Sequence, residues 1–210
     1  MKVVKLTEEN KAKILLQCER ILGQGGVIIG PSDTVYGIYA NASDEQAVKK
    51  IFKIKKRAPE KALSIFVKDI VAARRLAYID DRKARFLEKV WPGPVTAVFY
   101  KKDVISDLVT GGKETVGLRI PVHSFLRELL NRLDFPLVQT SANISGNEPV
   151  MSAEKAREQW KKEKAVALII DGGELNKQPS TIVDFSKNES IILRSGIITK
   201  KELDEMLGRA

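Results

Sequence analysis

Five short polar segments, spread along the chain at the ends of expected strands and helices or within them, contain the residues that could do chemistry. All of them hold hydroxyl groups, cationic side chains or both, and the sequence has neither a His/Cys set for a metal nor a Ser-His-Asp set. Hydroxyls and cations bind phosphates and small polar molecules. The sequence therefore predicts a binding site without a nucleophile of its own. The segments are Pro31 to Gly37, Lys55 to Lys61, Thr115 to Arg119, Thr140 to Asn143, and Ser180-Thr181 with Arg194.

The segment Pro31 to Gly37 follows a short apolar run, and α/β sheets place their ligand contacts at such strand ends. The alternative is a turn in which Ser32 and Asp33 bond their own backbone. The Gly and Lys spacing of a Walker A loop is missing.

Five positive charges fall between positions 53 and 61, at the end of an expected helix. Cations there complement the helix dipole, which is one explanation. The other is an anion such as a triphosphate or an RNA backbone, because five cations repel one another without one. The residues are Lys53, Lys55, Lys56, Arg57 and Lys61.

Two further segments place a hydroxyl and a guanidinium close together. Thr115 and Arg119 share a face of a strand, because side chains i and i+4 point the same way. The fork of Arg119 suits a substrate carboxylate, and the alternative is an edge-strand arginine in solvent. Ser180 begins an expected strand and Arg194 ends the next, so either residue could be structural or could line the site.

The segment at residues 140–143 is small and rich in hydroxyls, which is typical of an anion-binding turn. A catalytic Ser141 would need a histidine base, and His123 is the single histidine. We therefore interpret Ser141 as a binding residue and His123 as part of a turn or a helix start.

The elements that must position these segments alternate between strands and helices. Strands are expected near residues 27–29, 63–67, 95–100, 116–120, 136–138 and 166–170, with a hairpin at 182–185 and 191–193. Capping boxes at 43–46 and 199–202 start two helices. This pattern predicts one α/β domain over residues 1–210, built on a large twisted mixed sheet flanked by helices.

Composition limits the possible partners and locations. The net charge of +9 indicates an anionic partner, such as a nucleotide, RNA or an acidic protein, or else serves solubility alone. Cys18 is the single cysteine and lies in an apolar helical pattern, so we expect it in the core. No signal sequence or membrane span is recognisable, and we expect a cytoplasmic protein with no membrane partner.

Read in chain order, the segments resemble the YrdC-like family of threonylcarbamoyl-AMP synthases, in its single-domain form. The resemblance covers residues from about 6 to 196. Any one motif is weak evidence for this resemblance, but eight motifs in the family order are strong evidence. They are PSDTVYG, IFKIKKR, WPGPVT, TVGLRIP, TSANISG, DGG, STIVD and ILRSG. The family resemblance adds the expectation of an open concave ligand site.

The resemblance implies that L-threonine, bicarbonate and ATP, with Mg²⁺, are converted to threonylcarbamoyl-adenylate and pyrophosphate. The product would pass to a tRNA threonylcarbamoyltransferase complex for the N6-threonylcarbamoyladenosine modification of tRNA, and a direct tRNA contact is open. Threonine contacts carry over to Thr34, Arg119, Thr140 and Ser180. ATP contacts carry over to Lys55, Arg57, Lys61, Thr115, Ser141, Asn143 and Arg194.

The chain departs from the family pattern in four places. Ala58 and Ala62 stand where the family often has proline, a histidine that many members carry near Phe66 is absent, and residues 147–152 look one residue longer than usual. Contacts around Lys61 are affected most. Two other functions stay open: a non-catalytic module that binds double-stranded RNA or tRNA, and a divergent relative that hydrolyses a nucleotide or transfers another carbamoyl group.

Overall fold

The computed structural model describes residues 1–187 and 190–207, and its central feature is a ten-stranded sheet. The strand order is β1-β8-β2-β3-β7-β4-β6-β5-β9-β10. The strands are β1 (Lys2–Lys5), β2 (Val27–Gly30), β3 (Gly37–Asn41), β4 (Ser64–Phe66), β5 (Val95–Tyr100), β6 (Thr115–Arg119), β7 (Leu137–Ser141), β8 (Val166–Asp171), β9 (Thr181–Asp184) and β10 (Ile191–Arg194).

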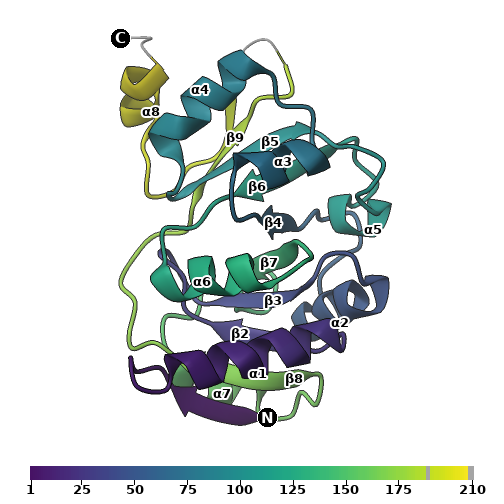
Figure 1. Ribbon diagram of the computed structural model, residues 1–210, viewed down its shortest axis with the longest axis vertical. Helices are drawn as coiled ribbons and strands as arrows, with labels where there is room; N and C mark the ends of the chain where they lie inside the picture. The colour runs from purple at the N-terminus through teal and green to yellow at the C-terminus, as the bar shows by residue number, and fades with distance from the viewer. Residues whose placement is uncertain (188–189, 208–210) are drawn as a thin grey trace.

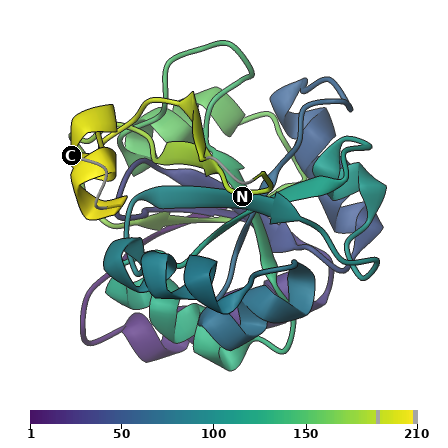
Figure 2. The ribbon, with the colours of Figure 1, turned by 90° about the horizontal axis from the view of Figure 1, so that it is seen from above.

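Helices lie on both sides of the twisted sheet, as Figure 1 and Figure 2 show, and strand β1 and the last helix, Lys200–Leu207, lie at opposite ends of the molecule. None of the helices in the described residues is long and apolar enough to cross a bilayer. They are α1 (Lys11–Gly23), α2 (Glu45–Lys55), α3 (Ile70–Leu76), α4 (Asp81–Val90), α5 (Asp107–Thr110), α6 (Ser124–Arg132), α7 (Ala153–Trp160) and α8 (Lys200–Leu207).

The sheet is mixed, which confirms the predicted fold class. Strand β8 pairs in parallel with β1 and β2, and β4 pairs in parallel with β6. Strand β7 runs antiparallel to both of its neighbours, β3 and β4. The predicted hairpin is also confirmed, because β9 and β10 pair antiparallel with Ile191 opposite Asp184.

Local sequence explains where two of the helices begin. The carboxylate of Asp44 accepts hydrogen bonds from the backbone amides of Gln46 and Ala47, at 2.8 and 3.2 Å, and so caps α2. At α8, the Thr199 amide donates to Glu202 Oε2 at 2.8 Å, and the Glu202 amide donates back to Thr199 Oγ1 at 3.3 Å. Both predicted capping boxes therefore mark real helix starts, with Asp44 as the capping residue of the first.

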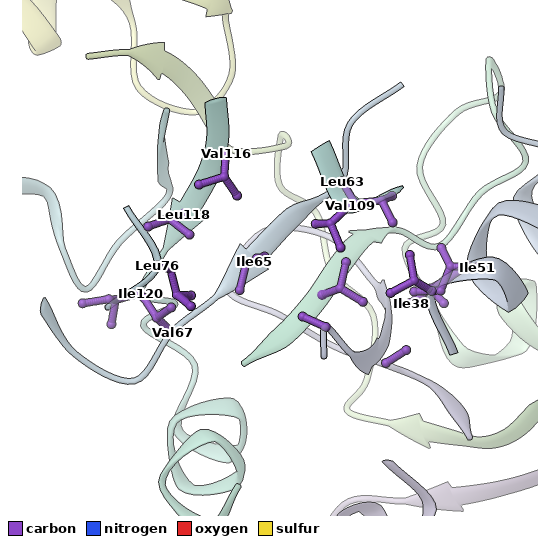
Figure 3. Packing of buried hydrophobic residues seen from close by; sticks show 14 of the residues in the cluster. Ile38, Ile51, Leu63, Ile65, Val67, Leu76, Val109, Val116, Leu118 and Ile120 are labelled. Atoms are coloured by element: carbon purple, nitrogen blue, oxygen red, sulfur yellow. The ribbon is translucent and has the colours of Figure 1, made fainter. Parts of the chain in front are cut away.

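Two apolar clusters fill the space between the sheet and the helices. The larger includes side chains of β4, β6 and α3, and Figure 3 shows Ile65, Leu118 and Leu76 in this layer. The smaller joins α1 and α6 to β2, β3 and β8, and it contains the fully buried Cys18. Cys18 is therefore a core residue, as predicted. Both clusters hold the sheet rigid beneath the loops at its strand ends.

The loop between β2 and β3 is held against the turn after β8. The Tyr36 hydroxyl donates to the Gly173 carbonyl at 2.7 Å and accepts from the Gly172 amide at 3.1 Å. A Cβ atom added to Gly172 would lie 2.5 Å from Cγ of Pro31, so only glycine allows this close approach. The sequence motifs PSDTVYG and DGG are therefore in direct contact.

Candidate active site

A cavity of about 130 Å³ lies where several loops and strand ends meet. Seven of the eleven predicted site residues line it, although they come from segments spread along the whole chain. They are Thr34, Arg57, Arg119, Thr140, Ser141, Ser180 and Arg194.

Arg119, the last residue of β6, is almost completely buried, as is Thr34. Its Nε donates to the Gly93 carbonyl at 2.8 Å, Nη1 to Thr34 Oγ1 at 3.2 Å, and Nη2 to Asp33 Oδ2 at 2.6 Å. Its guanidinium also lies 5.5 Å from the centre of the Phe66 ring. Strand β6 is internal to the sheet, so the alternative of an edge-strand arginine in solvent is wrong.

The contacts of Arg119 leave part of its hydrogen-bonding capacity unused. A guanidinium has five N–H groups, and three of them are bonded within the described part of the chain. Burial lowers the pKa of Arg119, and the Asp33 carboxylate opposes that effect. One N–H on each Nη atom therefore remains to bind a ligand carboxylate.

Arg57 and Arg194 add two more cations to the cavity lining. Arg57 follows the left-handed residue that ends α2, and its side chain donates to the carbonyls of Lys61 (3.0 Å) and Ala62 (2.7 Å). Arg194 Nη2 donates to the Ser180 carbonyl at 2.8 Å and to Ser180 Oγ at 3.2 Å. These bonds hold both guanidinium groups in place through backbone oxygens.

Neither Arg57 nor Arg194 has a carboxylate partner within salt-bridge distance among residues 1–187 and 190–207. Burial lowers the pKa of both side chains, with smaller contributions from Arg194 on Arg57 and from Arg119 on Arg194. Arg57 is partly buried and Arg194 is exposed, so solvent screens part of their repulsion, but like charges that share a cavity without a counter-ion still repel one another. The arrangement is therefore suited to a ligand that carries several negative charges.

The loop before β3 combines both interpretations made from the sequence. Ser32 Oγ donates to the Val35 carbonyl at 2.7 Å and accepts from the Thr34 amide at 3.0 Å, which is the local turn. The side chain of Asp33, in contrast, accepts a hydrogen bond from Arg119, and Thr34 Oγ1 accepts one from the same arginine. The turn therefore presents the Thr34 hydroxyl to the cavity.

Lys55 and Asn143 lie behind the cavity wall, which corrects the expectation that they line it. The buried Lys55 Nζ donates to the backbone carbonyls of Ser141 and Asn143, the latter at 2.6 Å. Burial lowers the pKa of Lys55 to about 7, and the charge of Arg57 adds to the effect. Asn143 Oδ1 accepts from Ser141 Oγ at 2.5 Å. Both residues tie the Ser141 turn to the end of α2.

Lys61 and Thr115 are the predicted ATP contacts that the structure does not bring to the cavity. The Lys61 side chain is exposed, and the residue instead uses its carbonyl to hold Arg57. Thr115 lies at the start of β6, about 13 Å along the strand from Arg119. His123 precedes α6 as its N-cap residue, as the sequence indicated.

The structure adds lining residues that the sequence did not single out. Ser64 and Gln139 face each other across β4 and β7, and Gln139 Nε2 donates to Ser64 Oγ at 3.0 Å. Behind the wall, Thr96 Oγ1 lies 2.9 Å from Ser180 Oγ. Only the strand register shows that these residues meet, although Thr96 belongs to the segment WPGPVT and could have been suspected.

The described residues contain no group of three or more His, Cys, Asp or Glu that could hold a metal ion. No acidic residue lines the cavity in the described part of the chain, and Asp33, next to the lining residue Thr34, is paired with Arg119.

Comparison with known proteins places the chain in a family. The model of the Sua5/YciO/YrdC family, described as "Telomere recombination", matches residues 20–196. The chain belongs to the Sua5/YciO/YrdC family. Among solved structures of the family, that of Pyrococcus abyssi Sua5 complexed with L-threonine superposes with a TM-score of 0.92 at 32% identity. This match covers 100% of the present chain and 62% of the Sua5 chain.

Curated members of the Sua5/YciO/YrdC family carry the name threonylcarbamoyl-AMP synthase. A Methanocaldococcus jannaschii protein, named so provisionally, is 38% identical over 205 residues, which are 97% of this chain and 95% of that protein. The Bacillus subtilis threonylcarbamoyl-AMP synthase is 33% identical over 197 residues, 92% of this chain and 56% of its own length. The chain thus spans nearly all of one relative and little more than half of the other.

Proposed function

We propose that this chain is an L-threonylcarbamoyladenylate synthase, which forms threonylcarbamoyl-AMP and pyrophosphate from L-threonine, bicarbonate and ATP. The observation that carries the proposal is the convergence of Arg57, Arg119 and Arg194 on one cavity that also holds several hydroxyls. The names of the curated relatives and the threonine complex of Sua5 support it.

The cavity divides into two ends of different chemistry. Arg119, with two free N–H groups beside the Thr34 hydroxyl, suits the carboxylate and hydroxyl of an amino acid. Arg57 and Arg194, which have no carboxylate partner among the described residues, suit the triphosphate. The hydroxyl of Ser180 accepts a hydrogen bond from Arg194 and so lies beside the second end. We assign threonine to the first end and ATP to the second.

The proposed reaction needs positioning and charge neutralisation rather than a protein nucleophile. The threonine amine attacks bicarbonate, losing a proton and releasing water, and becomes a carbamate. A carbamate oxygen then attacks the α-phosphorus of ATP, and pyrophosphate leaves as the P–O bond breaks. Arg57 and Arg194 would neutralise charge on the phosphates in the transition state. Mg²⁺ would enter as part of the MgATP substrate.

The proposal also includes the domain organisation of the protein, its location and its downstream partner. We infer that residues 1–210 form one YrdC-like domain, that the protein is cytoplasmic, and that its product passes to a tRNA threonylcarbamoyltransferase complex. The continuous sheet supports the single domain. The threonylcarbamoyl-AMP synthase names of the curated relatives support the tRNA pathway.

The direct test is pyrophosphate release by the purified protein with ATP, bicarbonate and threonine, each left out in turn. Release that depends on all three supports the proposal. Release without threonine would indicate a nucleotide hydrolase, and release with other amino acids in place of threonine would indicate a different carbamoyl transfer. RNA binding with no pyrophosphate release under any condition would favour the non-catalytic RNA-binding module.

A further inference from the structure

A second hollow, of about 460 Å³, lies away from the candidate active site, where the segment between α3 and α4 passes the end of β5. No residue that lines this hollow also lines the active-site cavity. Its walls include two tyrosines and three cationic residues: Tyr78, Tyr100, Arg74, Lys83 and Lys102.

The backbone holds Tyr78 and Tyr100 directly opposite each other. The Tyr78 amide donates to the Tyr100 carbonyl at 2.9 Å, the Lys102 amide donates to the Leu76 carbonyl at 2.8 Å, and Ala77 pairs antiparallel with Lys101. In such a pair, opposite residues project from the same face. Lys102 lies two residues after Tyr100 and projects from that face too. The aromatic pair and its lysine are therefore set by backbone pairing.

Both tyrosines are unusually open to solvent for aromatic residues. Tyr78 is 63% exposed and Tyr100 is 48% exposed, whereas the neighbouring Ala77 on the opposite face is buried. Lys102 Nζ lies 5.4 Å from the centre of the Tyr78 ring. Single exposed apolar residues are ordinary on a protein surface. Two aromatic rings in one hollow, with a cation over one of them, form a surface suited to stacking.

The charge of the hollow is positive. Lys102 has no carboxylate partner in the described part of the chain, and Arg74 is paired with Asp81 at 2.5 Å. The one lining carboxylate, Asp80, caps α4 by accepting from the Lys83 amide at 2.8 Å, and its Oδ2 lies 3.7 Å from Lys83 Nζ. Two carboxylates, Asp81 and Asp80, thus offset Arg74 and Lys83, and Lys102 is the lining cation that no described carboxylate pairs. The whole chain, with a net charge of +9, has the same sign.

We propose that this hollow binds single-stranded nucleic acid. Unpaired bases stack on Tyr78 and Tyr100, and the adjoining phosphates lie against Lys102 and Lys83. Stacking on tyrosine is open to every base, because each has an aromatic face, so we expect little sequence preference. A duplex keeps its bases inside the stack and cannot use the rings in this way. An acidic peptide would use the cations but would leave both rings without a matching partner.

The proposal concerns a surface outside the synthase site, and it does not depend on the proposed reaction. It assigns a nucleic-acid contact to a protein whose sequence shows no aromatic stacking motif. The two tyrosines meet only because the chain after α3 pairs with the end of β5.

The test is fluorescence anisotropy with a fluorescein-labelled oligo(U) of about 12 nucleotides, at several salt concentrations. We expect Tyr78→Ala and Tyr100→Ala each to weaken binding about tenfold, while Tyr78→Phe and Tyr100→Phe bind like the wild type. Lys102→Ala should reduce the slope of log affinity against log salt by about 0.7. Lys13→Ala and Leu16→Ala, on the exposed face of α1 at the other end of the sheet, serve as controls for one charge and one apolar side chain.

Wild-type affinity in the Tyr78→Ala/Tyr100→Ala double variant overturns the proposal, and so does an equal loss in the phenylalanine variants. Displacement of oligo(U) by oligoglutamate at the same charge concentration would assign the hollow to an acidic peptide instead. Equal binding of a blunt RNA duplex, unaffected by the tyrosine changes, would remove the stacking role. Threonine-dependent pyrophosphate release should be unchanged in these variants, so failure here is separable from failure of the synthase assignment.

Discussion

Nη2 of Arg119 lies 2.6 Å from Oδ2 of Asp33, and this ion pair, almost fully buried, joins the loop before β3 to the end of β6. The second oxygen of Asp33 has no hydrogen-bond partner in the structure. Since Arg119 also bonds Thr34 and Gly93, the pair fixes the direction in which its two free N–H groups point. Asp33 is therefore a positioning residue for the proposed threonine end of the cavity.

Replacing Asp33 tests this role. We expect Asp33→Asn to raise the KM for threonine about tenfold or more while the KM for ATP changes little, because Arg119 loses its orientation. The variant should also lose about 3 kcal/mol of unfolding free energy in urea, since the Arg119 charge stays buried without its partner. Asp107→Asn, which removes an exposed partner of Lys101, is the control and should cost less than about 1 kcal/mol. Equal effects in the two variants would contradict the assignment.

Substitutions can distinguish the roles of Arg57 and Arg194 from that of the nearby Lys61. We expect Arg57→Ala and Arg194→Ala each to lower kcat for pyrophosphate release about a hundredfold, with circular dichroism and thermal unfolding showing a folded protein. Lys61→Ala keeps the backbone carbonyl that holds Arg57, and its own side chain is exposed, so it should stay within about threefold of wild type. If Lys61→Ala loses as much activity as Arg57→Ala, the sequence-based assignment of Lys61 to ATP is right and the cavity described above is incomplete.

Lys55 predicts a specific dependence of stability on pH. Its pKa in the folded protein is about 7, below the unfolded value of 10.5, so between these pH values the unfolded chain binds the additional proton. The unfolding free energy therefore rises with pH in this window, by up to about 1.4 kcal/mol per pH unit, and this contribution is absent below pH 7. Lys55→Met removes the ionisable amino group at this position and leaves every other ionisable group in place.

The measurement is a urea titration of wild type and Lys55→Met at intervals from about pH 6 to about pH 10. This pH range is chosen from the folded and unfolded pKa values of Lys55. The difference between their unfolding free energies should be constant near pH 6 and should shift in favour of wild type as the pH rises. A constant difference over the whole range would show that Lys55 stays charged in the fold, held by the carbonyls of Ser141 and Asn143.

Tyr36 tests the contact between the first motif and the Asp171-Gly172-Gly173 turn. Tyr36→Phe removes one donated and one accepted hydrogen bond, and we expect it to cost about 1 kcal/mol of unfolding free energy. Tyr39→Phe, whose hydroxyl makes only long contacts of 3.3 Å to Gly30 and Pro31, should cost less. The reverse order in calorimetry or urea unfolding would contradict the importance of this contact.

Much of the architecture was readable from local patterns, because hydrophobic periodicity and capping act over a few residues. The apolar runs of β2, β5 and β8 and the caps of α2 and α8 were recognisable in this way. The order of strands in the sheet was not, since β4 pairs with β6 and β7 across long stretches of chain. Register likewise decides that Ser64 meets Gln139, and no local signal marks either residue.

The sequence by itself determined the chemistry of the protein: hydroxyls and arginines in a fixed order, a single histidine and no metal-binding set, which together point to anion binding without a nucleophile. Tertiary structure decided which of these residues share a cavity. It brought Arg57, Arg119 and Arg194 together, placed Lys55 and Asn143 behind the wall, and left Lys61 outside. Only the tertiary structure places Tyr78 and Tyr100 in the same surface hollow. The reason is that residue type is a local property, whereas distance and burial depend on long-range strand pairing.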